Sequence, residues 1–330
     1  VQANYGETLR SIASYGAGTL YGGELGDLLV NEIARLGGLI SYEDLNSYKV
    51  EEREPIRGCY RGYEVIGPPP PASAGVHIVQ MLNLLEGFDI ASMGYGSSDS
   101  VHLLAEVLKI AFADRAVATA DPAFIDVPVE KLIDKVYAEE RRHLIDMSQA
   151  KQWSPGVRVS DSHSTTHVTV ADALGNVVAS THTINGLFGA CLQIPGTGLL
   201  ANNYMFNFDP HPHTALSVQP GKRVFTSMAP MMVCREQQMK VALGLPGGMR
   251  IFPSAFQTLV NLLDHGMTLQ EAVEAPRIWT EGGRLEMEST FSAELEMSLV
   301  ARGHDVVRLQ RIAGGMNAIG FSDDGMLTGA

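Results

Sequence analysis

The sequence is short of cysteine and of basic residues, and each shortage excludes a class of protein. Its three cysteines, Cys59, Cys191 and Cys234, are far apart and form no C-x-x-C pair, so they suit neither a zinc site nor a disulfide framework. We expect three buried free thiols. Lys and Arg number 24 against 37 Asp and Glu, a net charge of −13 that argues against nucleic acid or an anionic membrane as a partner. No run of 18 apolar residues occurs, so no segment is expected to span a bilayer.

What is present is the composition of a globular chain, with 45% hydrophobic and 18% charged residues over 330 positions. Apolar periodicity and capping residues predict helices at 24–36, 75–85, 99–118, 131–147 and 251–265, and further helices opened by Ser41, Thr268 and Ser292. Hairpins are predicted within 55–66, across 226–235 and 239–244, and across 318–321 and 326–330. Helices mixed with antiparallel hairpins indicate stacked layers and an α+β fold class.

The clearest hairpin pairs Thr165–Val170 with Val177–Thr183, across a turn in which Gly175 supplies a residue suited to positive φ. If the loop has three residues, Thr165 lies opposite Thr183, and two hydroxyls meet across the ladder. A two-residue loop would instead shift the register by one and turn the faces over.

A threonine at the start of a strand has a specific chemical use. Its hydroxyl is a weak nucleophile unless a base removes the proton, and the residue's own α-amine can do so when the residue is a chain terminus. An α-amine titrates near pH 8, so a useful fraction is the free base at neutrality. Thr165 is internal, so this chemistry requires cleavage of the Ser164–Thr165 bond, which follows the polar segment 157–164. The alternative is a strand that is rich in Thr only because β-branched residues favour strands.

Several stretches carry motifs that occur in one order along the chain. They are Pro68–Gln80, Thr165–Val168, Thr181–Gly189, Gly198–Asn203, Gly221–Pro230 and Gly244–Arg250. Together they resemble the γ-glutamyltranspeptidase family in both order and spacing, and the resemblance covers essentially all 330 residues.

This resemblance implies the fold of N-terminal-nucleophile hydrolases, a four-layer αββα sandwich that is incomplete in this chain. It implies that residues 1–164 are the C-terminal part of a large subunit and that residues 165–330 are the small subunit. The two parts would stay associated after self-cleavage between Ser164 and Thr165. Because family members are longer on the N-terminal side and the last hairpin reads as cut short, we expect the chain to be a fragment.

The resemblance also implies the catalytic residues. Thr165 would be the nucleophile and, after cleavage, its α-amine the base, while Thr183 would support the nucleophile. Gly247 and Gly248 would form the oxyanion hole, since two glycines let backbone N–H groups approach a ligand closely. Read alone, Pro-Gly-Gly is simply a turn.

Substrate contacts are implied at Asn185 and at Thr226 and Ser227, the latter pair holding a substrate α-carboxylate. Read alone, these positions are a turn dipeptide and a solvated loop. Most transpeptidases bind the γ-glutamyl α-ammonium with a carboxylate and an amide, but this sequence has Asn207 and Tyr204 there. This variant is more similar to the cephalosporin-acylase branch, whose glutaryl substrates lack the α-amine. The family arginine that pairs with the substrate carboxylate falls upstream of Val1.

Three other patterns resemble functional motifs but are better explained without a functional site. Residues 196–201 fit G-x-G-x-x-A, but an Asn-Asn pair follows where a helix should continue, so we expect a turn. Ser73 lacks the first glycine of a nucleophile elbow. Asp209, His211 and His213 are potential metal ligands, but prolines interrupt them and a solvated loop fits better. We expect neither a metal nor another cofactor.

The sequence therefore predicts an autoprocessing amidohydrolase and acyltransferase that cleaves γ-glutamyl or glutaryl amides, such as glutathione, through an acyl-enzyme on Thr165. The alternative enzyme is a cephalosporin acylase acting on glutaryl-7-aminocephalosporanic acid. The non-enzyme alternative is a truncated, uncleaved and inactive fragment. The expected partner is a small-molecule amide, and the compartment, whether periplasmic, secreted or cytoplasmic, is left open.

Overall fold

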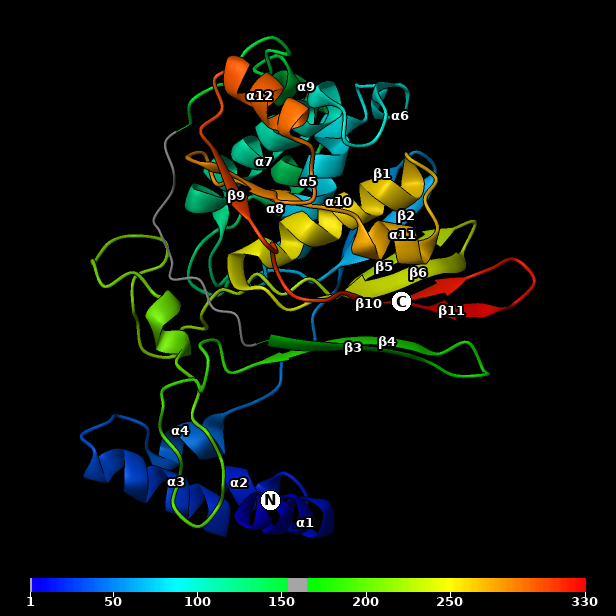
Figure 1. The fold of residues 1–330 in the computed structure, drawn as a ribbon. Coiled ribbons are helices and arrows are strands. Elements are labelled where there is room, and N and C mark those ends of the chain that lie inside the picture. Colours follow the sequence, from blue (N-terminus) through cyan, green and yellow to red (C-terminus); the bar gives the residue numbers. More distant parts are fainter. Residues whose placement is uncertain (1, 154–164) are drawn as a thin grey trace. The chain divides into compact units, whose positions relative to one another are not determined.

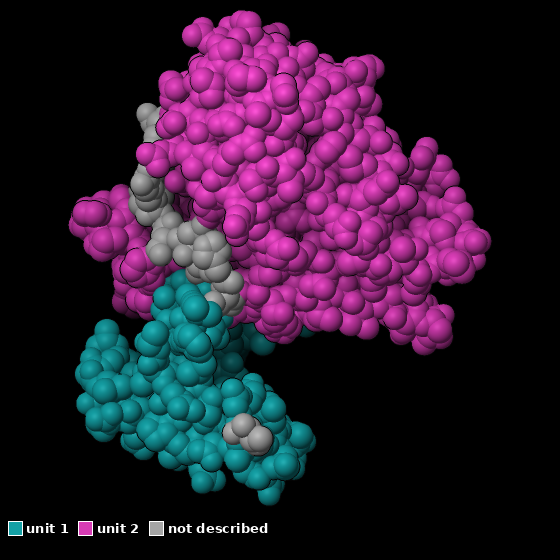
Figure 2. Space-filling model, viewed as in Figure 1, with its two compact units in different colours: residues 1–53, 184–204 teal, residues 54–183, 205–330 magenta. Residues whose placement is uncertain are grey.

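The computed structural model describes residues 2–153 and 165–330, which fall into two compact units. One unit consists of residues 1–53 and 184–204 and the other of residues 54–183 and 205–330 (Figure 2). Of the two residues at the predicted cleavage site, Ser164 lies outside the described residues, and Thr165 is the first residue of the second described segment. The predicted division into large and small subunits concerns a covalent cut, so it need not follow these units.

The smaller unit is helical. It contains α1 (Ala3–Tyr15), α2 (Gly18–Tyr21), α3 (Glu24–Arg35) and α4 (Tyr42–Ser47), together with the loop 184–204. Thr8 of α1 holds this loop by donating a hydrogen bond of 2.8 Å to the carbonyl of Thr197. Ser41 caps α4 as predicted, and it and Asp44 exchange the two hydrogen bonds of a capping box. Residues 196–201 lie in a turn and loop that do not continue into an α-helix, as expected.

The larger unit is built on a six-stranded antiparallel sheet. Its strands, in spatial order, are β1 (Ile56–Tyr60), β2 (Tyr63–Gly67), β5 (Met231–Arg235), β6 (Gln238–Gly244), β10 (Asn317–Phe321) and β11 (Leu327–Gly329). The three predicted hairpins therefore lie side by side in one sheet. The second hairpin begins at Met231 and not at Thr226, because Pro230 has no N–H for a ladder and Thr226 forms only an isolated bridge with Ala72.

Helices cover one face of this sheet, and a separate hairpin lies against the other (Figure 1). The helices packed on the sheet are α5 (Ala74–Leu85), α10 (Ile251–Leu263) and α11 (Leu269–Glu274). Behind or beside them lie α6 (Ile90–Met93), α7 (Ser98–Ala118), α8 (Val129–Ile133), α9 (Lys135–Arg142) and α12 (Ala293–Ala301). The hairpin is β3 (Thr165–Ala171) with β4 (Val177–Thr183). Every residue of α5 is buried, so this helix is the centre of the core. The layers run helix, sheet, sheet.

A three-stranded sheet of β7 (Ile278–Trp279), β8 (Leu285–Glu288) and β9 (Val306–Leu309) completes the larger unit, with β8 and β9 parallel. Across the described residues, no helix is both long enough and apolar enough to cross a bilayer.

Two local predictions were wrong. The single helix predicted over 131–147 is two short helices, α8 and α9, because Asp134 is extended (ψ 135°) and its carboxylate accepts the N–H of Val136 as a cap. The three cysteines are free thiols as predicted, but only Cys234 is buried, whereas Cys59 and Cys191 are exposed.

A buried polar network joins α7 to the segment after α12. Glu106 of α7 accepts a hydrogen bond of 2.8 Å from Lys109, and the ammonium of Lys109 lies 3.5 Å from Nδ1 of His304. His102 Nε2 lies 2.8 Å from the carbonyl of Asp146 and must donate to it, so its Nδ1 accepts from His304 Nε2–H at 2.8 Å. Both imidazoles are neutral in this arrangement. Burial lowers the pKa of His304 to about 3, helped by the nearby charge of Lys109.

This network predicts a pH-dependent stability. An unfolded histidine gains a proton near pH 6.5, whereas folded His304 stays neutral to about pH 3, so the unfolded state binds more protons in between. The stabilisation is complete above pH 6.5 and is lost as the pH falls below it. Between pH 7 and pH 5 the free energy of unfolding should drop by roughly 1–2 kcal/mol more in the wild type than in His304→Gln.

Urea unfolding at the two pH values measures this difference. His143 is exposed, so His143→Gln is the matched control and should keep the wild-type pH dependence. An equal drop in all three proteins would mean that His304 does not resist protonation in the folded state.

Candidate active site

The start of β3 carries a hydroxyl pair. The register of β3 and β4 places Thr165 opposite Thr183, and the Thr165 hydroxyl donates a hydrogen bond of 3.1 Å to Oγ1 of Thr183. The loop has three residues, because Asp172 N–H donates across it to the carbonyl of Asn176 at 3.1 Å. Thr165 is half-buried. The structure thus confirms the predicted register and brings the two hydroxyls together.

His167, two residues along the same face of β3, fixes this hairpin to the large sheet. Thr169 donates to the carbonyl of Asn317 at 3.3 Å, so its oxygen accepts from His167 Nε2–H at 3.1 Å. His167 Nδ1 must then accept from the Thr181 hydroxyl at 2.8 Å. Burial lowers the pKa of His167 to about 4, which keeps this neutral tautomer at physiological pH.

The His167 ring lies directly on Gly244, the last residue of β6. A Cβ at Gly244 would be 2.2 Å from Cε1 of His167, so only glycine allows the hairpin to approach this strand so closely. Three residues later the chain turns at Gly247. The contact therefore ties the strand that begins with Thr165 to the strand that leads into the glycine turn. The beginning of β10 pairs with the end of β6. In Figure 1, β3 and β10 begin on the same side of the two stacked sheets.

The glycine turn presents unused backbone donors. Gly247 has φ 145° and Gly248 has φ 58°, conformations that L side chains rarely adopt. Gly248 opens the short 3₁₀ helix η2 (Gly248–Arg250), in which Arg250 N–H donates to the Gly247 carbonyl at 3.0 Å. Within the described residues, the N–H groups of Gly247 and Gly248 donate to no protein acceptor. They are available to a ligand.

Thr226 and Ser227 lie beside this turn. The Ser227 hydroxyl donates to the sulfur of Met249, in η2, at 3.4 Å, and accepts from Nη2 of Arg115 at 3.1 Å. Thr226 Oγ1 accepts the N–H of Met228 at 3.1 Å. Both residues are half-buried and held by the core, so the view of this pair as a solvated loop is wrong.

The remaining predicted residues are divided between the units. Asn185 and Tyr204 belong to the smaller unit, where Asn185 is buried and adopts φ 70° in a turn. Asn207 ends the 3₁₀ helix η1 (Tyr204–Asn207), belongs to the larger unit, and is buried.

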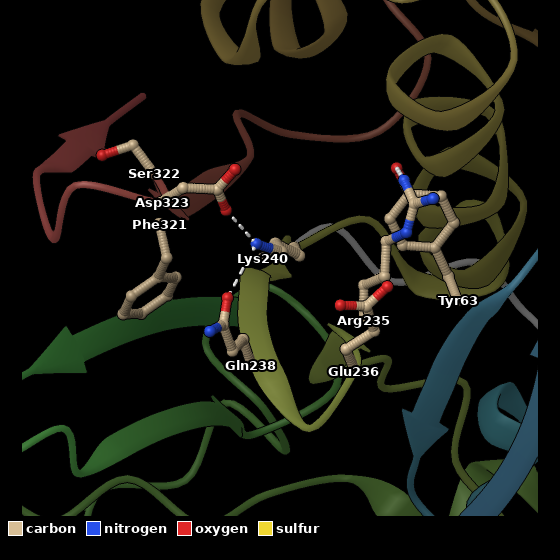
Figure 3. Close-up of a pocket in the computed structure, with 8 residues that line it drawn as sticks. All are labelled: Tyr63, Arg235, Glu236, Gln238, Lys240, Phe321, Ser322 and Asp323. Carbon is tan, nitrogen blue, oxygen red and sulfur yellow. Dashed lines mark hydrogen bonds and ion pairs between the residues drawn. The ribbon is translucent and has the colours of Figure 1, made fainter.

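Two other features of the larger unit contain no predicted site residue. One is a polar surface pocket at the strand ends (Figure 3), where Lys240 contacts Asp323 and donates to Gln238 at 3.3 Å. The other is the His102, Glu106 and His304 network, whose side chains have metal-ligand spacing in the described part of the chain. Lys109 already occupies it with an ammonium, and every imidazole nitrogen has a partner, so it is a closed structural network.

The segment that contains Asp209 and His211 is a loop, in which Asp209 is buried and His211 is exposed. The Asp209 carboxylate accepts from the N–H of His211 at 2.9 Å and pairs with its imidazole at 2.8 Å, while the His211 side chain is 82% exposed. This contact is complete without an ion.

Sequence reasoning missed two residues that hold the site, His167 and Arg115. His167 lies within the Thr165–Val168 motif, but no function was predicted for it from the sequence. Arg115 directly follows Asp114 near the end of α7, and no local pattern in the sequence marks it as a site residue.

Comparison with known proteins places these features in a family. The whole chain, residues 1–330, matches the family model of gamma-glutamyltranspeptidase. It is 66% identical over 330 residues to the acylase ACY 1 proenzyme of Pseudomonas sp. (strain SE83) and 39% identical over 347 aligned residues to the glutathione hydrolase proenzyme of Escherichia coli. Both alignments include 100% of this chain, but only 59% and 60% of those proteins. The chain therefore spans about three fifths of the length of these relatives.

A solved structure, that of a cephalosporin acylase from Bacillus halodurans, matches with a TM-score of 0.90 and 31% sequence identity. The match covers 99% of this chain and 60% of that chain.

The His167–Gly244 contact predicts a cost for any side chain at position 244. Gly244→Ala would force the His167 ring or the whole hairpin to move, and overpacking of this kind costs roughly 1–3 kcal/mol in the free energy of unfolding. Amide hydrogen exchange in β3 and β4 should also become faster than in the wild type.

The matched control is Gly283→Ala, because a Cβ there meets nothing within 4 Å. Denaturant unfolding and hydrogen exchange check both variants. If Gly244→Ala behaves like Gly283→Ala, the close contact between the two sheets is not present in solution.

Proposed function

Because the chain belongs to the γ-glutamyltranspeptidase family, we propose that it carries the nucleophile of an autoprocessing amidohydrolase and acyltransferase. Its fold is that of N-terminal-nucleophile hydrolases, shared with a cephalosporin acylase. Cleavage of the Ser164–Thr165 bond would give Thr165 a free α-amine. The large part ending at Ser164 and the small part beginning at Thr165 would then remain associated.

The single observation that carries this proposal is the hydrogen bond from the Thr165 hydroxyl to Thr183. It fixes the nucleophilic oxygen at the first residue of a strand, where a cut would place an amine on the same residue. The amine takes the hydroxyl proton as Oγ1 attacks the acyl carbon of an amide. Thr183, whose Oγ1 lies 3.1 Å from Oγ1 of Thr165, would hold the nucleophile in place for this attack.

The glycine turn supplies the second requirement of acyl transfer. As Oγ1 bonds to the carbonyl carbon, negative charge develops on the carbonyl oxygen, and the unused N–H groups of Gly247 and Gly248 are suited to stabilise it. The tetrahedral intermediate collapses, the C–N bond breaks, and the amine leaves with a proton. Water or a second amine then attacks the ester on Thr165 and restores the hydroxyl.

A carboxylate on the acyl group is the feature that the Thr226–Ser227 pair would recognise. γ-Glutamyl and glutaryl amides both carry a carboxylate three carbons from the acyl carbon, so one subsite serves both. The Ser227 hydroxyl donates to the sulfur of Met249 in η2, so a carboxylate bound by this pair would lie next to the glycine turn. The resemblance to the family also predicts substrate contacts at Asn185 and Tyr204.

A glutaryl-specific acylase is the second candidate, because Asn207 stands where a carboxylate would hold the α-ammonium of a γ-glutamyl group. An amide oxygen offers no formal charge to a cation, whereas a glutaryl group has no cation to satisfy. The 66% identity to an acylase proenzyme favours the same specificity.

The nucleophile assignment predicts that Thr165→Ala, made in the full-length reading frame, abolishes both chain cleavage and turnover, because one hydroxyl serves both steps. Thr165→Ser keeps a hydroxyl and should retain part of both. Intact-mass measurement detects cleavage, and release of a chromogenic amine detects turnover.

A matched control is Thr328→Ala, which removes an exposed strand hydroxyl on β11 and should leave cleavage intact. Turnover by the Thr165→Ala protein would overturn the assignment. The 330-residue chain itself tests the inactive-fragment alternative, which is favoured if that chain stays in one piece.

The specificity assignment predicts that Asn207→Asp raises kcat/KM for a γ-glutamyl anilide, relative to the glutaryl anilide, by about 10- to 100-fold. A charge-assisted hydrogen bond to the α-ammonium contributes roughly 1.5–3 kcal/mol, and about 1.4 kcal/mol corresponds to one decade. The measurement is this ratio on paired chromogenic substrates.

Asn31→Asp controls for the added charge, because Asn31 is exposed on α3 and its substitution should leave the ratio unchanged. An unchanged ratio in Asn207→Asp would show that Asn207 does not face the α-position of the substrate.

A further inference from the structure

Arg115, near the end of α7, is a buried cation that the proposed reaction does not yet use. Its side chain is 7% exposed, and its Nε donates to Ser73 Oγ while its Nη2 donates to Ser227 Oγ, both at 3.1 Å. The ring of Phe225 lies 4.8 Å from the guanidinium carbon, and the ring of Phe252 lies 5.7 Å from it. The guanidinium is therefore held by serine hydroxyls and aromatic faces.

Among the described residues Arg115 forms no direct ion pair, although the negative charge of Glu281 acts on it from a greater distance. A buried charge with no directly paired opposite charge is costly. Burial lowers the pKa of Arg115 to about 10, so the group still carries its charge at neutral pH. The site therefore retains positive charge that an incoming anion can neutralise.

Arg115 also decides the direction of the Ser227 hydroxyl. A guanidinium only donates, so the bond from Nη2 makes Ser227 Oγ an acceptor and leaves its proton to be donated elsewhere. That proton currently points to the sulfur of Met249 at 3.4 Å, and a thioether is a weak acceptor that a carboxylate oxygen can replace.

The orientation of the Thr226 hydroxyl is fixed in a similar way. Its Oγ1 accepts the N–H of Met228, so its proton is also available for donation. Ser73 holds the Thr226 carbonyl through its N–H at 2.9 Å and its hydroxyl at 3.1 Å. Ser73 thus connects Arg115 to the backbone of this pair.

We propose that Arg115 is a positioning residue for the carboxylate subsite: it fixes Ser227 as an acceptor so that the Ser227 proton is donated to the carboxylate of the acyl group. The guanidinium is hydrogen-bonded to that hydroxyl, so its positive charge stabilises the bound carboxylate without contacting it. This inference rests on the proposed function, because it assigns the Thr226–Ser227 pair to a substrate carboxylate.

Arg115→Gln tests the inference with two chromogenic amides, a glutaryl anilide and its analogue with a terminal carboxamide in place of the carboxylate. In the wild type the carboxylate substrate should have the higher kcat/KM. Arg115→Gln should lower its kcat/KM by at least 30-fold, mainly through KM, and change that of the carboxamide less than 3-fold. Arg115→Lys keeps the charge but not the two-armed geometry, so it should restore part of the loss.

A double substitution shows whether Arg115 acts through Ser227. Once Ser227→Ala has removed the hydroxyl, Arg115→Gln should change the ratio of the two substrates no further. An equal loss on both substrates would reduce Arg115 to a structural residue, and an additive loss in the double variant would mean that Arg115 acts independently of Ser227.

Ser73→Ala provides the test if Arg115→Gln does not fold. It removes one of the two hydroxyls that hold the guanidinium but leaves the charge, and it should lower the preference for the carboxylate substrate by 3- to 10-fold. An unchanged preference would overturn the inference.

Binding of glutarate to the Thr165→Ala protein, followed by calorimetry, separates this inference from the proposed reaction. If the wild type hydrolyses neither amide but glutarate binds and Arg115→Gln weakens that binding at least 10-fold, the proposed reaction fails and the carboxylate subsite stands. Glutarate binding that is unaffected by Arg115→Gln would overturn the inference whatever the activity.

Discussion

The contact between the His167 ring and Gly244 is the constraint on which the placement of the β3–β4 hairpin, and of Thr165 with it, depends. A two-stranded hairpin is marginally stable by itself, so β3 and β4 need another surface to hold their shape. His167 supplies the attachment because it reaches Gly244 on β6, while Asn317 of β10 bonds to the His167 carbonyl at 3.0 Å. Thr165, the first residue of β3, is therefore held in position by the contacts of His167, two residues along the strand.

The site is divided into two pairs of hydroxyls that the fold orients by different means. Thr165 and Thr183 meet because antiparallel register places them opposite each other. Thr226 and Ser227 are adjacent in sequence, and their hydroxyls are oriented by donors from Met228 N–H and Arg115. Register is a property of the backbone and turn, whereas the second arrangement requires a helix from the other half of the chain.

That difference explains how much the sequence could predict. The Thr165–Thr183 pairing followed from Gly175, a turn length and strand alternation, all of which are local. The contact of Arg115 with Ser227 joins residues 112 positions apart, and no local pattern marks it. Asp134 shows the opposite failure: one residue in an extended conformation divided a helix that periodicity predicted as continuous.

Two of the three thiols are exposed, and they lie in different units. Cys59 lies on β1 of the larger unit, Cys191 lies in the loop of the smaller unit, and Cys234 is buried. A maleimide dye would therefore react at one position in each unit and leave the third thiol unmodified. Energy transfer between two such dyes would report the separation of the units in solution, with no engineered cysteine, before and after the chain is cut.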